Sequence, residues 1–194
     1  MKMKNSERGN LITVVGIDPA LRNFGFCIAK VDMDNDEIVD VVDLRLAKSE
    51  DEAGKKVRRN SDDLRRAKTL TDALQECCKG NTLAFAEVPV GSQSARAMAS
   101  YGICIGVLAS CPIGMIEVTP TENKVCATGK KTATKQEMID WAVGLFPHAP
   151  WLKRKVKGKE TLRNDNEHLA DALGAINAGL KTSQWKQLKS FLNV

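Results

Sequence analysis

Apolar residues in the first part of the chain follow the pattern of β-strands. The run at 11–18 is almost continuously apolar and β-branched, which suits a strand buried on both faces, and it ends at Asp18-Pro19. Further runs at 24–31 and 38–44 follow after short turns. Because short turns join neighbouring strands as antiparallel hairpins, we expect these three strands to form a meander.

Apolar residues in the rest of the chain recur mostly at helical spacing. This spacing predicts helices over residues 62–79, 93–110, 132–145 and 165–180, and a short helix near 185–191. Short apolar runs at 82–86 and 114–118 indicate buried strands, whereas residues 148–163 have the composition of a loop. The order of elements predicts an α/β fold with a mixed sheet covered by helices. No G-x-G-x-x-G sequence follows the first strand, which argues against a Rossmann fold.

The length and composition of the chain are those of one globular domain. Its 194 residues are 43% hydrophobic and 27% charged, so we expect a single domain over residues 1–194, with 1–10 as a flexible N-terminal tail. No apolar run approaches the ~20 residues that span a bilayer, and the polar start lacks a signal-peptide pattern. These features favour a cytoplasmic protein that has no membrane contact.

The cysteines and histidines do not indicate a zinc site. Six cysteines include no Cys-x-x-Cys pair, and the chain has only two histidines. Structural zinc sites draw their ligands from closely spaced Cys and His residues, so this chain lacks the usual spacing. Together with the missing signal peptide, this favours reduced and mostly buried thiols.

Basic residues gather in three runs, although the net charge is only +5. The runs lie at 55–68, 124–135 and 153–159, whereas many acidic residues lie between 32 and 52. One such run is usually a solvated face, but three of them favour a shared surface that binds phosphates. The residues that we expect to contact nucleic acid are Arg58, Arg59, Lys130, Lys131, Arg154 and Lys155.

Two predicted strands end in an acidic residue. Asp18 ends the first strand and Glu87 ends the strand at 82–86. A turn-forming Asp before Pro is common, and Glu87 alone could be an edge residue that faces solvent. If the two strands are parallel neighbours, however, both carboxylates emerge at one edge of the sheet, where open α/β sheets bind ligands.

The start of the last long helix supplies further candidate ligands. His168 and Asp171 are three residues apart and share a helix face, and Glu167 shares a face with Asp171. With Asn164 as N-cap, Glu167 would instead be the partner in a capping box, so we rank His168 above Glu167 as a ligand. A partly exposed helix histidine and a solvent-facing Asp171 are the alternatives.

Carboxylates from separate elements favour a hard divalent cation. Oxygen ligands completed by water suit Mg²⁺ or Mn²⁺ better than zinc. Two such ions can bind the attacking and leaving oxygens of a phosphodiester, so we expect two ions per site. Asp18, Glu87, Asp171 and His168 are the expected ligands, with Glu167 as the substitute for His168.

Together these motifs resemble the RuvC family of Holliday junction resolvases, within the RNase H-like superfamily. The resemblance covers residues 11–180 and suggests a divergent or bacteriophage member. The motifs that carry it are Gly16-Ile17-Asp18-Pro19 with Gly25-Phe26, Ala86-Glu87-Val88-Pro89, Gly102 with Gly106, Pro120-Thr121-Glu122-Asn123-Lys124, Lys135, and His168-Leu169-Ala170-Asp171-Ala172-Leu173.

The resemblance implies a fold, an activity and partners. The implied fold is a five-stranded mixed sheet, with the first three strands antiparallel, flanked by helices. The implied activity is paired nicking of four-way DNA junctions by a homodimer, with Lys124 and Lys135 near the scissile phosphate and a branch-migration motor as a further partner. The chain departs from the bacterial pattern at Val90, where the family has an aromatic residue that stacks on a junction base.

Three alternatives remain open from the sequence. A related RNase H-like nuclease could act on RNA–DNA hybrids, and a non-catalytic protein on the same scaffold could bind junctions without cutting them. A sugar-kinase or actin-like ATPase also has an Asp after its first strand. The short chain, without room for a second domain, argues against that third alternative.

Overall fold

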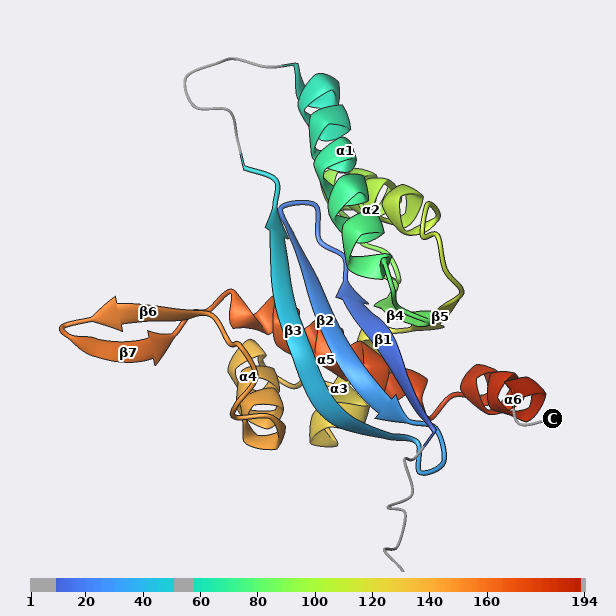
Figure 1. Cartoon of the computed structure of the whole chain (residues 1–194). Coiled ribbons are helices and arrows are strands. Elements are labelled where there is room, and N and C mark those ends of the chain that lie inside the picture. Colours follow the sequence, from blue (N-terminus) through green and yellow to red (C-terminus); the bar gives the residue numbers. More distant parts are fainter. Residues whose placement is uncertain (1–9, 51–57, 193–194) are drawn as a thin grey trace, which may run out of the picture.

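A five-stranded mixed sheet in the order β3-β2-β1-β4-β5 forms the middle layer of the computed structural model, which describes residues 10–50 and 58–192 (Figure 1). The strands are β1 (Leu11–Asp18), β2 (Asn23–Asp32), β3 (Glu37–Lys48), β4 (Leu83–Glu87) and β5 (Met115–Val118). The first three strands pair antiparallel, whereas β1–β4 and β4–β5 pair parallel. The predicted mixed sheet is therefore confirmed, and β1 and β4 are parallel neighbours.

Helices cover both faces of this sheet. The described helices are α1 (Arg59–Cys78), α2 (Ala95–Leu108), α3 (Pro120–Thr128), α4 (Lys135–Leu145), α5 (Asn166–Gly179) and α6 (Ser183–Leu192). Buried residues of α1 and α2 share one hydrophobic cluster with the sheet, and those of α4 and α5 share a second cluster on the opposite face. None of the helices in the described part of the chain is long and apolar enough to cross a membrane.

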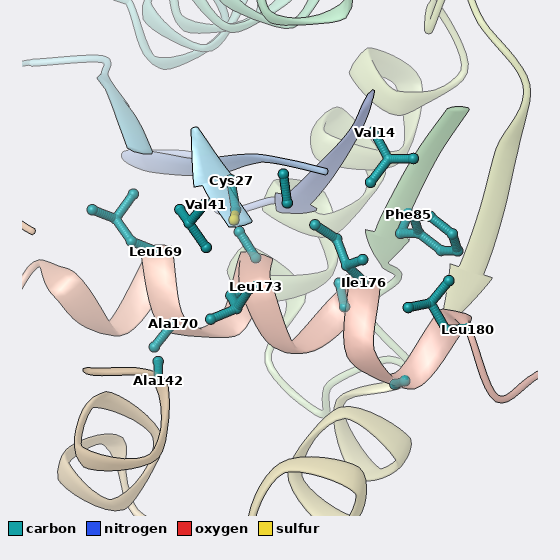
Figure 2. Close-up of a cluster of buried hydrophobic side chains, with 14 of the residues drawn as sticks. Val14, Cys27, Val41, Phe85, Ala142, Leu169, Ala170, Leu173, Ile176 and Leu180 are labelled. Atoms are coloured by element: carbon teal, nitrogen blue, oxygen red, sulfur yellow. The ribbon is translucent and has the colours of Figure 1, made fainter. Parts of the chain in front are cut away.

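Alternation along the strands assigns side chains to these two clusters. On β1, Val14 lies in the α5 cluster, whereas Val15 and Ile17 lie in the α1–α2 cluster. Successive side chains of a strand point to opposite faces, so a buried strand must be apolar on both. Figure 2 shows the α5 cluster, in which Leu173 and Ile176 of α5 project towards the sheet that carries Val14.

The segment at 148–163 is not a simple loop, as its composition suggested. It contains a two-stranded hairpin formed by β6 (Lys153–Val156) and β7 (Lys159–Leu162). Lys157 and Gly158 both have positive φ, 48° and 79°, as a two-residue type I′ turn requires. The prediction failed because Lys-Gly is a weaker turn signal than Asn-Gly, and a basic run has no apolar alternation.

Helix α3 was also missed. Thr119 is its N-cap, Glu122 completes a capping box and Pro120 occupies the first turn, all of which are readable sequence signals. Other predicted elements agree with the structure to within a few residues at their ends. The expected N-terminal tail falls outside the described residues except for Asn10, as do residues 55–57 of the first basic run.

Candidate metal centre

Strand alternation directs Asp18 and Glu87 to the same face of the sheet. Asp18 is two residues beyond Gly16 on β1, and Gly16 faces α5, because a Cβ there would meet α5 atoms. Glu87 is two residues beyond Phe85 on β4, and Phe85 belongs to the α5 cluster. Because β1 and β4 are parallel neighbours, both carboxylates emerge at one edge of the sheet, beneath α5.

Two glycines allow α5 to lie directly on the sheet. A Cβ at Gly16 would be 2.0 Å from the carbonyl oxygen of Ala172, and one at Gly25 would be 2.3 Å from that of His168. No real side chain could approach a backbone oxygen so closely. The close packing brings the first turns of α5, with His168 and Asp171, to the end of β1 where Asp18 lies.

The first contact in this centre joins His168 to Asp18. His168 Nδ1 donates a hydrogen bond to Asp18 Oδ2 at 2.6 Å, between side chains that are 15% and 11% exposed. Burial disfavours the charged imidazole, but the hydrogen bond and the charge of Asp18 together raise the pKa of His168. His168 is therefore a partly exposed helix histidine whose ring contacts Asp18.

Glu167 lies beside this pair and is not a capping residue. The N-cap of α5 is Asp165, not Asn164, and no side-chain hydrogen bond caps the helix. Glu167 Oε1 instead accepts a hydrogen bond from Lys135 Nζ at 2.7 Å and lies 3.5 Å from His168 Nε2. The capping-box interpretation was wrong because the helix begins one residue later than predicted. The side chain of Glu167 contacts Lys135 and His168 instead.

Asn123 of α3 is a site residue that the sequence reasoning missed. Its side chain is fully buried, and its Nδ2 donates to Glu87 Oε2 at 2.7 Å and to the carbonyl oxygen of Asp171 at 2.9 Å. A Cβ at Gly174 would overlap its side-chain oxygen, so glycine in α5 makes room for it. The sequence has no signal for this contact, because it depends on how α3 packs against α5.

The three carboxylates of the centre favour a bound cation. Burial, together with the charge of neighbouring carboxylates, Asp18 among them, raises the pKa of Glu87 to about 7 and that of Asp171 to about 8. Burial also raises the pKa of Asp18, although the hydrogen bond from His168 acts in the opposite direction. Buried carboxylates close enough to repel one another need a positive partner to remain charged.

Among the described residues, two buried side-chain oxygens of the centre have no hydrogen-bond partner, Asn123 Oδ1 and Asp171 Oδ1. Asp171 Oδ1 is inaccessible to solvent and accepts no hydrogen bond, which is costly unless a ligand binds it. As they stand, no three His, Cys, Asp or Glu side chains of the described residues converge on one point that could hold an ion. Asp18 Oδ2 and Glu87 Oε2 accept hydrogen bonds from His168 and Asn123, and each carboxylate has a second oxygen that could bind an ion.

Two lysines lie close to the centre. Burial and neighbouring carboxylates raise the pKa values of Glu87 and Asp171, and the charge of Lys124 acts in the opposite direction on both. Lys135 starts α4, and its side chain is 77% exposed although it pairs with Glu167. Both predicted lysines therefore lie within electrostatic reach of the acidic residues, and Lys135 remains accessible to a ligand.

The predicted DNA-binding residues lie on separate parts of the molecule. Arg58 and Arg59 are exposed at the start of α1, Lys130 and Lys131 precede α4, and Arg154 and Lys155 are on β6. Figure 1 shows the start of α1 at the top of the molecule, the β6–β7 hairpin at its left, and α4 below the hairpin. Lys130 also pairs with Glu137 at 2.7 Å.

Without a bound divalent cation, we expect the stability of the protein to fall as the pH rises. Between an unfolded carboxyl pKa near 4 and the raised pKa values of about 7 for Glu87 and about 8 for Asp171, the folded state binds more protons than the unfolded state. Stability decreases with pH wherever that is so. Thermal melts in EDTA should give a lower Tm at pH 8 than at pH 5, and Mg²⁺ or Mn²⁺ should raise Tm most at pH 8. A Tm that responds to neither pH nor metal would contradict the proposed centre.

No protein-family model matches the chain, and no curated protein matches its sequence. Two solved structures of Thermus thermophilus RuvC resemble it at 16% identity, covering 91% of this chain and 96% of theirs. One is bound to a Holliday junction substrate (TM-score 0.58), and the other has a TM-score of 0.57. A Fowlpox virus resolvase with its Holliday junction DNA is 12% identical, with a TM-score of 0.47 over 91% of this chain and 99% of that one.

The likeness to the two Thermus thermophilus RuvC structures establishes the fold class. The meander followed by two parallel strands, with helices on both faces, is the RNase H-like fold. Within that class, the chain shares the fold of the RuvC Holliday junction resolvases, as its sequence motifs predict.

Proposed function

We propose that this protein is a metal-dependent endonuclease that resolves four-way DNA junctions by paired nicks. The observation that carries the proposal is that β1, β4 and α5 of a RuvC-like fold place Asp18, Glu87, His168 and Asp171 at one edge of the sheet, within hydrogen-bond or electrostatic reach of one another. One of the structural neighbours is bound to a Holliday junction substrate. The same four positions are those that the sequence motifs assign to metal ligands.

Asp18, Glu87, Asp171 and His168 would hold two Mg²⁺ or Mn²⁺ ions. When bound, such ions supply a hydroxide nucleophile and stabilise the departing oxygen of a phosphodiester. The chain contributes carboxylates fixed on rigid elements, with Asn123 holding the orientation of Glu87 through its hydrogen bond. Lys124 and Lys135 would stabilise negative charge on the scissile phosphate.

A homodimer would present two such centres to a junction with two-fold symmetry. The face of α2 turned away from the sheet is built from small exposed residues, among them Ala99, Gly102 and Gly106. A Cβ at either glycine would meet nothing within 4 Å, so a second helix can approach α2 closely. Beside it lies an open groove of about 510 Å³ against α1, where Leu64 is 59% exposed.

Replacing Lys135 with Ala should slow cleavage while leaving junction binding nearly intact. Its ammonium group is accessible beside the carboxylates, and loss of one charge that stabilises a transition state costs roughly 10–10³-fold in rate. Single-turnover cleavage of a labelled junction measures the effect. Lys181→Ala, an exposed lysine after α5, is the matched control and should cleave at the parental rate. An unchanged rate for Lys135→Ala would remove this lysine from the proposed chemistry.

A substrate panel tests the proposed function as a whole. Labelled four-way DNA, linear duplex DNA and an RNA–DNA hybrid are incubated with the protein in Mg²⁺ and in Mn²⁺. The proposal expects the four-way DNA to be cut fastest. Faster cutting of the hybrid would assign the protein to the hybrid-specific nucleases of the same fold class, and binding without cutting would indicate a non-catalytic junction-binding protein.

A further inference from the structure

The β6–β7 hairpin is a basic ribbon that projects from the body of the protein (Figure 1). Residues 153–161 are all exposed, and five of the seven residues from 153 to 159 are basic. In the described part of the chain, only Lys153 of these five has a carboxylate partner, Glu160, at 3.6 Å. A ribbon with so many exposed cations and no apolar face does not serve packing, which points to a polyanionic partner.

The base of the hairpin is fixed to α5 by one buried side chain. Asn166 is fully buried, its Oδ1 accepts from the backbone N–H of Leu152, and its Nδ2 donates to the carbonyl oxygens of Leu152 and Arg163. The backbone N–H of Arg163 also donates to the carbonyl oxygen of Leu152 at 2.9 Å. These bonds clamp the two chain segments together where they leave the body.

The same helix carries the metal centre. Asn166 is the first residue of α5, and His168 and Asp171 follow within the next two turns. The hairpin base therefore has a fixed position relative to the proposed scissile phosphate. Strands of four residues extend about 13 Å from that base.

Cations lie on both faces of the ribbon. Arg154 is paired with Thr161 on one face, and Lys155 is paired with Glu160 on the other, because successive residues of a strand alternate. A straight duplex lying against the ribbon would contact one face only. Two duplex arms that diverge from a branch point would supply phosphates to both faces.

We propose that the β6–β7 hairpin lies between two duplex arms of a branched DNA and so selects junctions over linear duplex. This inference rests on the proposed function, because it takes the DNA at the metal centre as one of the two arms. The inference goes beyond the proposed function because it names the hairpin as the element that recognises the branch point. The family position for a stacking aromatic is occupied here by Val90, so selection would rest more on phosphate contacts than on base stacking.

The test compares two double variants that remove the same charge. Arg154→Ala with Lys155→Ala removes one cation from each face of the hairpin. Lys181→Ala with Lys186→Ala removes two exposed cations, one just after α5 and one on α6. Binding to a four-way junction and to a linear duplex is measured in EDTA over a range of salt concentrations. All four side chains are exposed, and thermal melts confirm that each variant is folded.

The hairpin variant should bind the junction about 10-fold more weakly, with a salt slope shallower by about 2, while duplex binding changes less than about threefold. The control variant should change neither. Equal weakening on junction and duplex would indicate that the hairpin binds a single duplex, for example in its major groove, and would overturn the proposal, as would unchanged junction binding. If the parental protein itself shows no preference for the junction, the proposed function fails. If the preference exists and survives in the hairpin variant, only the hairpin inference fails.

Discussion

Replacing Asp18 with Asn is expected to abolish metal-dependent cleavage while the protein still folds and binds junction DNA. Asp18 is 8% exposed at the end of β1, and its carboxylate forms a hydrogen bond with His168. The amide has the same shape but cannot supply the charge that holds a divalent cation. A loss of roughly 10³-fold or more in rate is expected, equivalent to about 4 kcal/mol of transition-state stabilisation.

The control for this variant is Asp140→Asn. Asp140 is exposed on α4, where its Oδ1 accepts a hydrogen bond from Gln136, and it lies outside the proposed centre. It should keep the parental single-turnover rate in Mg²⁺ and in Mn²⁺. Junction binding by both variants, measured in EDTA, should match that of the parental protein. A cleavage rate for Asp18→Asn within about threefold of the parental rate would contradict the assignment.

Replacing Gly16 with Ala is expected to destabilise the protein strongly. The added Cβ would lie 2.0 Å from the carbonyl oxygen of Ala172 and 2.8 Å from Ile176 Cγ1, so α5 must move away from β1. Overpacking of a core typically costs 1–3 kcal/mol, and a clash with backbone lies at about the upper end or beyond it. At about 2–4 °C per kcal/mol for a chain of this size, Tm should fall by roughly 6–12 °C.

Gly144→Ala is the matched control for the stability measurement. Gly144 is exposed in α4, and a Cβ there would meet nothing within 4 Å. Because Ala has a higher helix propensity than Gly, this variant should be as stable as the parental protein or more stable by up to about 1 kcal/mol. Urea unfolding of both variants measures the change. A Gly16→Ala protein of parental stability would mean that α5 does not rest on β1 as described.

The sequence predicted the parts of the centre that depend on strand ends. Asp18 and Glu87 each follow a continuous apolar run, and such runs reveal buried strands that end at a sheet edge. Their parallel pairing was a condition of the prediction, and the observed register of β1 with β4 meets it. His168 and Asp171 followed from helical spacing alone, because residues three apart share a helix face.

Contacts between elements could not be predicted in the same way. Asn123 reaches Glu87 only because α3 packs against α5 at Gly174, and no local pattern encodes that packing. Glu167 was misinterpreted because the sequence predicts the first residue of a helix only to within a residue or two. A shift of one residue is enough to remove Glu167 from the capping-box position. The basic ribbon at 153–162 was hidden because its residues are exposed on both faces and show no apolar alternation.

The most direct test of the account is to map nicks on a labelled four-way junction. The protein is incubated with the junction in Mg²⁺, in Mn²⁺ and in EDTA, and the products are resolved on a denaturing gel. The account predicts nicks at symmetric positions near the branch point in two opposing strands, in both metals and not in EDTA. Binding without nicks in either metal, or nicks that persist in EDTA, would contradict the assignment of Asp18, Glu87, His168 and Asp171 to a metal-dependent nuclease centre.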